Sequence, residues 1–112
     1  MATTINHESK INTTISGGGY TLDLTSLAGF DGTGLRIQRI SVANPAGSTG
    51  NVTIATGATN GYALPASIVV YPGGNFVESY NDGGGQDVDA THKTLDVSGT
   101  NGDTPIIALS LS

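Results

Sequence analysis

The chain lacks cysteine and tryptophan altogether, and only 12% of its 112 residues are charged, against an average of about 25%. Without cysteine, a disulfide framework, a thiolate nucleophile and any Cys-based zinc or iron–sulfur site are excluded. Four cationic residues stand against nine acidic ones, for a formal net charge of −5. We expect no nucleic-acid partner, because phosphate binding requires a clustered excess of lysine and arginine.

Long apolar runs are also missing. The longest, residues 66–71 and 105–109, are far too short to cross a bilayer, so no membrane partner is expected. The N-terminal residues show neither the basic nor the apolar region of a secretory signal peptide, which predicts a soluble protein made in the cytosol.

What the chain has in abundance is glycine, 17 residues in all, between short stretches of alternating apolar and polar residues. Glycine supplies the positive-φ positions of hairpin turns, and the threonine, valine and isoleucine between them suit a pleated surface. We count about eight strands, spaced roughly every 10 to 14 residues. This pattern predicts an all-β protein: a single-domain antiparallel β-sandwich over residues 11–112, with a jelly roll among the arrangements it fits.

Several local expectations follow from the pattern. Residues 1–10 are polar and do not alternate, which predicts a flexible or partner-bound N-terminal arm. A first strand is expected from Ile11, and residues 25–30 are compatible with one helical turn closed by Gly29. The apolar residues change parity at Gln38–Arg39, which predicts a bulge or a change of face, the alternative being a strand covered on both sides. Residues 67–71 are nearly all apolar, as in a central strand buried on both faces.

The acidic loop at residues 81–89 is the first candidate site. Asp82, Asp87 and Asp89 could converge on a hard cation through their oxygens. The segment does not match a calcium-binding loop motif, and a solvated hairpin loop is the simpler interpretation. We therefore expect neither a metal nor a cofactor.

A second candidate, the pair Asp89 and His92, has the acid and base of a catalytic triad. No serine lies in a Gly-x-Ser-x-Gly elbow, so a nucleophile is missing. We expect no catalytic residue and no enzymatic activity. Glycan binding is a third candidate, because tyrosine rings can stack on sugars, and Tyr62 and Tyr80 are its candidate residues.

Protein–protein contact is the remaining candidate function. Low charge density lowers the desolvation penalty of an interface, and strand edges or an N-terminal arm can add to a neighbour's sheet. Arg36 and Arg39 could form ion pairs across such an interface, or could be solvated edge charges. Ile5 and Ile11, in and beside the predicted arm, are further interface candidates.

Finally, several segments resemble small virion proteins of tailed bacteriophages. They are YTLDLTSLAGF (20–30), LRIQRI (35–40), GNVTIATGATNGY (50–62), YPGG (71–74), KTLDVSG (93–99) and the closing residues 106–111. The resemblance implies a head decoration or cement protein, placed in the virion after synthesis in the host cytoplasm. It also implies a homo-oligomer, with a trimer favoured, in contact with the major capsid protein or another virion protein. A glycan- or receptor-binding module of a phage fibre or adhesin is the alternative.

Overall fold

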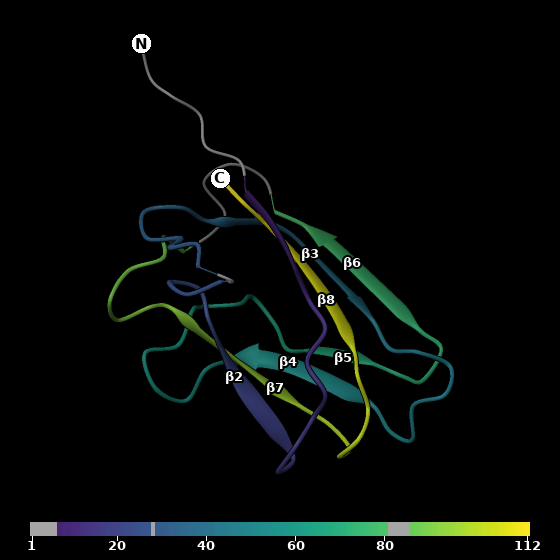
Figure 1. Ribbon diagram of the computed structural model, residues 1–112. Coiled ribbons are helices and arrows are strands. Elements are labelled where there is room, and N and C mark those ends of the chain that lie inside the picture. The colour runs from purple at the N-terminus through teal and green to yellow at the C-terminus, as the bar shows by residue number, and fades with distance from the viewer. Residues whose placement is uncertain (1–6, 28, 81–85) are drawn as a thin grey trace.

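The computed structural model describes residues 7–27, 29–80 and 86–112, and these form strands and loops without a helix. No described segment is therefore a helix that could span a membrane. The strands, shown in Figure 1, are β1 (His7–Ile11), β2 (Gly19–Asp23), β3 (Ile37–Ala43), β4 (Val52–Thr56), β5 (Ile68–Val70), β6 (Asn75–Ser79), β7 (Thr94–Ser98) and β8 (Ile106–Leu111).

The strands form two four-stranded sheets. The first has the order β1-β8-β3-β6 and the second β2-β7-β4-β5, and all neighbouring strands are antiparallel. The first strand pairs with the last, the second with the seventh, the third with the sixth and the fourth with the fifth. This nested pairing, folded over into two packed sheets, is a jelly roll. The predicted antiparallel β-sandwich is confirmed, and its topology is now defined.

The core lies between the two sheets and is built by alternation along each strand. In β8, Ile107, Leu109 and Leu111 are buried while the residues between them are half-buried on the outer side. Across the first sheet, Ile107 pairs with Val42 and Leu109 with Ile40, so the buried rows continue from strand to strand. The core is aliphatic, and its only fully buried aromatic side chain among the described residues is Tyr62.

The predicted bulge in β3 is confirmed. The register against β8 shifts between Ile37 and Arg39, which leaves Gln38 as the extra residue. The shift lets Ile37 and Ile40 both face the core, where each is at most 1% exposed. The change of parity in the sequence therefore records a bulge rather than a strand that is covered on both faces.

Two local expectations were wrong. Residues 68–70 form an edge strand, because β5 pairs only with β4, and Val69 on its outer side is 50% exposed. Leu27 and Phe30 form an isolated bridge with two backbone hydrogen bonds instead of a helical turn. Gly29 between them has a φ of +89°, a conformation that glycine adopts readily and that does not belong to a right-handed helix.

The N-terminal arm predicted over residues 1–10 overlaps β1 at His7–Lys10, which pair with β8 from Leu111 to Ala108. Residues 1–6, including the interface candidate Ile5, lie outside the described residues. The strand expected to begin at Ile11 instead ends there. The strand reaches back to His7, which faces inward. The His7 ring stacks on Phe30 with 3.6 Å between ring centroids, a contact that the polar sequence of residues 7–10 does not indicate.

The loop between β4 and β5 packs closely on β7. The Gly57 N–H donates to the Thr94 carbonyl at 3.0 Å, and the Tyr62 N–H donates to the same oxygen at 2.8 Å. A Cβ at position 57 would lie 2.8 Å from the Thr94 Cβ and 2.9 Å from its carbonyl oxygen. Position 57 therefore requires glycine because there is no space for a side chain.

We predict that Gly57→Ala destabilises the protein by about 1–3 kcal/mol, since the backbone must shift to admit the methyl group. Gly47→Ala is the matched control, because a Cβ there meets nothing within 4 Å. The control should leave stability unchanged or raise it slightly. Urea unfolding followed by circular dichroism measures both, and equal stabilities for the two variants would contradict the packing argument.

Candidate interaction surface

Most of the aspartates serve as hydrogen-bond acceptors within loops. The most connected is Asp103, in the loop between β7 and β8, whose carboxylate accepts the Thr49 N–H at 3.0 Å and the Gly50 N–H at 3.1 Å. The Thr49 hydroxyl adds a bond of 2.9 Å. The Asp103 carbonyl accepts the Ile15 N–H at 2.8 Å. Asp103 thus ties together three loops at the end of the molecule opposite the C-terminus (Figure 1).

Other aspartates act over shorter spans. Asp23 accepts the N–H and hydroxyl of Thr25 at 2.9 and 2.7 Å, and Asp31 does the same with Thr33. Asp96 accepts bonds from Thr21 and from the Ala58 N–H. Hydrogen bonds to the ionised form favour it, so the pKa values of Asp23 and Asp31 lie below their ordinary value. Much of the negative charge is therefore engaged in holding loops.

The metal candidates are not brought together in the described part of the acidic loop. Asp87 is ion-paired with Arg36, with 2.5 Å between carboxylate oxygen and Nε. Asp89 accepts the Thr91 N–H at 2.9 Å. Asp82 lies outside the described residues. In the part of the chain that is described, no group of three or more His, Asp or Glu side chains could hold a metal ion.

Asp89, Thr91 and His92 lie close together, but not as a triad. Asp89 Oδ1 lies 2.9 Å from His92 Nδ1, and the Thr91 hydroxyl lies 3.0 Å from the same nitrogen. A triad places the acid on one ring nitrogen and the nucleophile on the other, so that the ring can relay a proton. Here both groups contact Nδ1, at the tip of an exposed turn. The cluster caps the turn, and the hydrogen bonds from Thr91 and His92 lower the pKa of Asp89.

The tyrosines differ from the expectation for a glycan site. Tyr62 is 2% exposed, and its hydroxyl oxygen accepts the Ile37 N–H at 3.1 Å, so it has no free ring face for a sugar. Burial raises the pKa of Tyr62. Tyr80 is half-buried against the core. The most exposed ring is that of Tyr71, 69% exposed just after β5, and its position at the end of an edge strand could not be read from the sequence.

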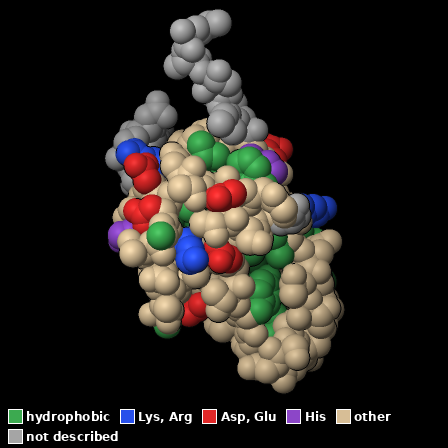
Figure 2. Space-filling view, turned by 60° about the vertical axis from the view of Figure 1, so that its left-hand side comes forward, with side chains coloured by type: hydrophobic (Ala, Val, Ile, Leu, Met, Phe, Trp, Pro, Cys, Tyr) green, Lys and Arg blue, Asp and Glu red, His purple; other side chains and the backbone are tan. Residues whose placement is uncertain are grey.

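The interface candidates are separated by the fold. Arg36 is half-buried and paired with Asp87, and Ile11 is partly buried against the core. Arg39 is exposed on the solvent side of the first sheet. Figure 2 shows that charged side chains on the face in view are few, in places with acidic and basic groups side by side.

The solvent side of the first sheet, here called the outer face, is the surface that collects candidate residues. Its middle row runs Lys10, Ala108, Ser41 and Val77 across the four strands, and the next row runs Glu8, Ser110, Arg39 and Ser79. The small side chains are those of Ala108 and Ser110 on β8 and Ser41 on β3, and the longer side chains of Glu8, Lys10 and Arg39 surround them. They leave a shallow depression of about 350 Å³, lined in part by Glu8, Lys10 and Arg39.

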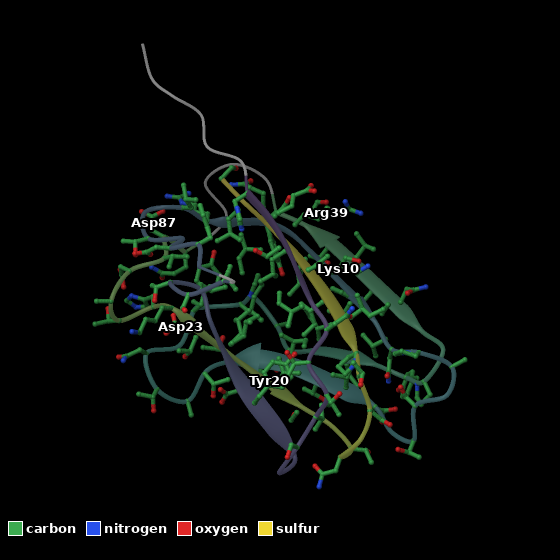
Figure 3. The ribbon with its side chains drawn as sticks, viewed as in Figure 1. Lys10, Tyr20, Asp23, Arg39 and Asp87 are labelled. Carbon is green, nitrogen blue, oxygen red and sulfur yellow. The ribbon has the colours of Figure 1, made fainter. Side chains whose placement is uncertain are left out.

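The outer face is also electrostatically distinct. Two of the four cations, Lys10 and Arg39, lie on it (Figure 3), and among the described residues neither forms an ion pair. The other two cations are engaged, Arg36 with Asp87 and Lys93 with Asp23 at 3.9 Å. Lys10 was missed by the sequence analysis, because it was assigned to the arm and its position opposite β8 depends on the strand pairing.

The fold is similar to that of one solved chain from an animal virus, and a plant-virus chain gives a weaker match. A chain of the virus-like particle of the extra small virus of the giant freshwater prawn Macrobrachium rosenbergii matches 99% of this chain and 81% of its own, with a TM-score of 0.59 and 18% identity. The tobacco streak virus coat protein matches 100% of this chain and 90% of its own, with a TM-score of 0.47 and 7% identity. No protein-family model and no curated protein matches the sequence. The likeness to the prawn-virus chain is one of fold.

The Asp103 loop clamp should make stability depend on pH. Backbone hydrogen bonds from Thr49, then Gly50, hold the pKa of Asp103 below its ordinary value despite its burial. A lowered folded-state pKa contributes stability that is present above the unfolded pKa of about 3.9 and is lost as pH falls through the folded value. Asp103→Asn should lower the thermal midpoint at pH 7, and this deficit should shrink as pH falls below about 3.9.

Asp31→Asn is the matched control. Asp31 also has a lowered pKa, but among the described residues its carboxylate accepts hydrogen bonds only from Thr33 in its own loop, so its loss should lower the midpoint less. Thermal unfolding at pH 7, 5, 3 and 2 measures both. A deficit for Asp103→Asn that stays constant from pH 7 to pH 2 would show that its carboxylate charge is not what holds the loops.

Proposed function

We propose that this chain is a non-enzymatic structural protein of a virus particle, which acts through contacts between protein surfaces. The observation that carries the proposal is the eight-stranded jelly roll. A chain of a virus-like particle matches it over 99% of the present chain. Jelly rolls serve as viral capsid domains, and also as lectins and cupins. The sequence resemblance to small phage virion proteins favours the same class of function.

The side-chain chemistry favours surface contact over the other uses of a jelly roll. The described aspartates are largely engaged in loops, and the Asp89–His92 pair caps a turn. Tyr62, a candidate for sugar stacking, is buried. What remains accessible is the outer face, with its shallow depression, Lys10 and Arg39, together with exposed strand edges. These features suit association with proteins.

Two structural roles fit this proposal. In the first, the chain decorates a phage head as a homo-oligomer, with a trimer favoured, bound to the major capsid protein after synthesis in the host cytoplasm. The sequence resemblance favours this role. In the second, the chain itself builds the shell, and the fold likeness to the prawn-virus chain favours it. The roles differ in whether the protein assembles alone.

Purified protein distinguishes the two roles. A shell protein forms closed particles by itself, visible by electron microscopy and as fast-sedimenting species. A decoration protein forms a defined small oligomer that binds undecorated phage heads and raises their thermal stability. Protein that forms neither particles nor head-bound oligomers contradicts the proposed function.

The outer face can be tested in either assay. Arg39→Gln removes from this face a cation that forms no ion pair with a described residue. The substitution should weaken assembly or head binding, while the thermal midpoint of the protein stays unchanged. Lys93→Gln removes the same charge away from the outer face and is the control. Equal effects of the two substitutions would assign the loss to net charge rather than to the outer face.

A further inference from the structure

We propose that the open edge of β1 pairs with the same edge of a second copy of this chain about a twofold axis, so that Glu8 of each copy lies opposite Lys10 of the other. The inference does not depend on the proposed viral role, because it concerns association of the isolated protein. It rests on the backbone at this edge and on the order of charges along it.

One side of the β1 backbone has no partner strand within the described part of the chain. β1 is the terminal strand of the first sheet and pairs on one side with β8. Beyond this pairing, no other described segment forms a backbone hydrogen bond with residues 7–11. In Figure 1, β1 is the purple strand that runs alongside β8. Alternate N–H and C=O groups of an edge strand point away from its sheet and are available to another strand.

The edge is also accessible along its length. A depression of about 200 Å³ is lined by the five residues of β1 together with Leu27. The side chains of Glu8 and Lys10 are exposed. Glu8 has one weak partner, the Ser110 hydroxyl at 3.4 Å, and Lys10 forms no ion pair with a described residue.

The sequence of β1, His-Glu-Ser-Lys-Ile, is complementary to itself when it is read antiparallel. If two copies pair with Ser9 opposite Ser9, Glu8 falls opposite Lys10 and Lys10 opposite Glu8. Both side chains lie on the outer face, so each pair is a direct cross-strand pair of opposite charges, which stabilises antiparallel pairing. An interface of this kind uses the same patch on both copies and closes as a dimer.

The other sheet edges lack this pattern. Self-pairing of β2 about Thr21 would place Gly19 opposite Asp23, without a charge pair. In β6 the only charged residue is Glu78, which lies in the inward row opposite Ile40. The remaining edge strand, β5, has three residues, all of them apolar. Complementarity of charge therefore selects β1.

The pairing joins the first sheet of one copy to the first sheet of the other, which gives one continuous sheet of eight strands. The outer faces of both copies then form one continuous surface, with the two Glu8–Lys10 pairs at its centre. The competing interpretation is that Glu8 and Lys10 protect the edge, since charged side chains on edge strands discourage pairing with other chains. Charge reversal separates the two interpretations. If Glu8 and Lys10 recognise a second copy, a single reversal weakens the dimer. If they protect the edge, there is no dimer for the reversal to weaken.

Sedimentation equilibrium of the full chain tests the charge pairs. Glu8→Lys or Lys10→Glu alone places like charges opposite each other and should weaken the dimer about tenfold or more. The double variant Glu8→Lys/Lys10→Glu restores opposite charges in reversed order and should restore the dimer. An equimolar mixture of the two single variants should form heterodimers. Thermal unfolding confirms that each variant is folded.

Cross-linking tests the register. The chain has no cysteine, so Ser9→Cys introduces a single thiol that faces its counterpart across the axis, at a separation that a disulfide can bridge. Glu8→Cys is the control, because its counterpart is displaced by two residues. Mild oxidation should yield a covalent dimer from the first variant and little from the second. If the protein forms a larger assembly, cross-linking of the Ser9→Cys and Glu8→Cys variants is compared in the assembled protein.

The proposal predicts a wild-type dimer that both single reversals weaken, that the double reversal restores, and that cross-links through position 9. A wild-type protein that stays monomeric at millimolar concentration overturns it. So does association that the charge reversals leave unchanged, or equal cross-linking of the two cysteine variants. None of these outcomes depends on whether virus-like particles form.

Discussion

The packing of two four-stranded sheets against each other is the constraint on which the rest of the structure depends. The chain has no disulfide and no helix among its described residues, so its stability comes from aliphatic side chains on the two inner faces. Nested pairing brings the ends of the described chain together, β1 against β8, and makes most contacts long-range. Every strand must therefore hold its register, and the bulge at Gln38 is the local adjustment that keeps β3 in phase with the core.

The acidic character of the chain serves the loops that this packing creates. A jelly roll places its connections at two ends, where backbone N–H groups leave the ladders and need acceptors. Asp103 supplies them for the loop between β3 and β4, and Asp23, Asp31 and Asp89 do so within tight turns. A net charge of −5 is consequently a weak guide to partners, because most of the described carboxylates already have hydrogen-bond partners in the same chain.

The surfaces left for association are those that the core and the loops do not use. The outer face of the first sheet carries small residues between Glu8, Lys10 and Arg39, and β1 ends that sheet with one side of its backbone unpaired among the described residues. A surface of this kind suits the structural role proposed above, since such a role depends on repeated contacts between copies. The described histidines and tyrosines are occupied by packing or turn formation, with Tyr71 as the exposed exception.

The sequence by itself indicated the class of fold, a count of about eight strands and the bulge, because strand alternation and glycine turns are local signals. It did not determine β1, because two of its three inward positions, His7 and Ser9, are polar and their packing depends on β8 and Phe30, which lie elsewhere in the chain. For the same reason the sequence predicted a central strand at residues 67–71, gave no sign of the contacts of Asp103, and placed Lys10 in an arm. Which strand lies at an edge, which side chain is covered and which loop meets a carboxylate are set by long-range pairing. Only the tertiary structure could decide them.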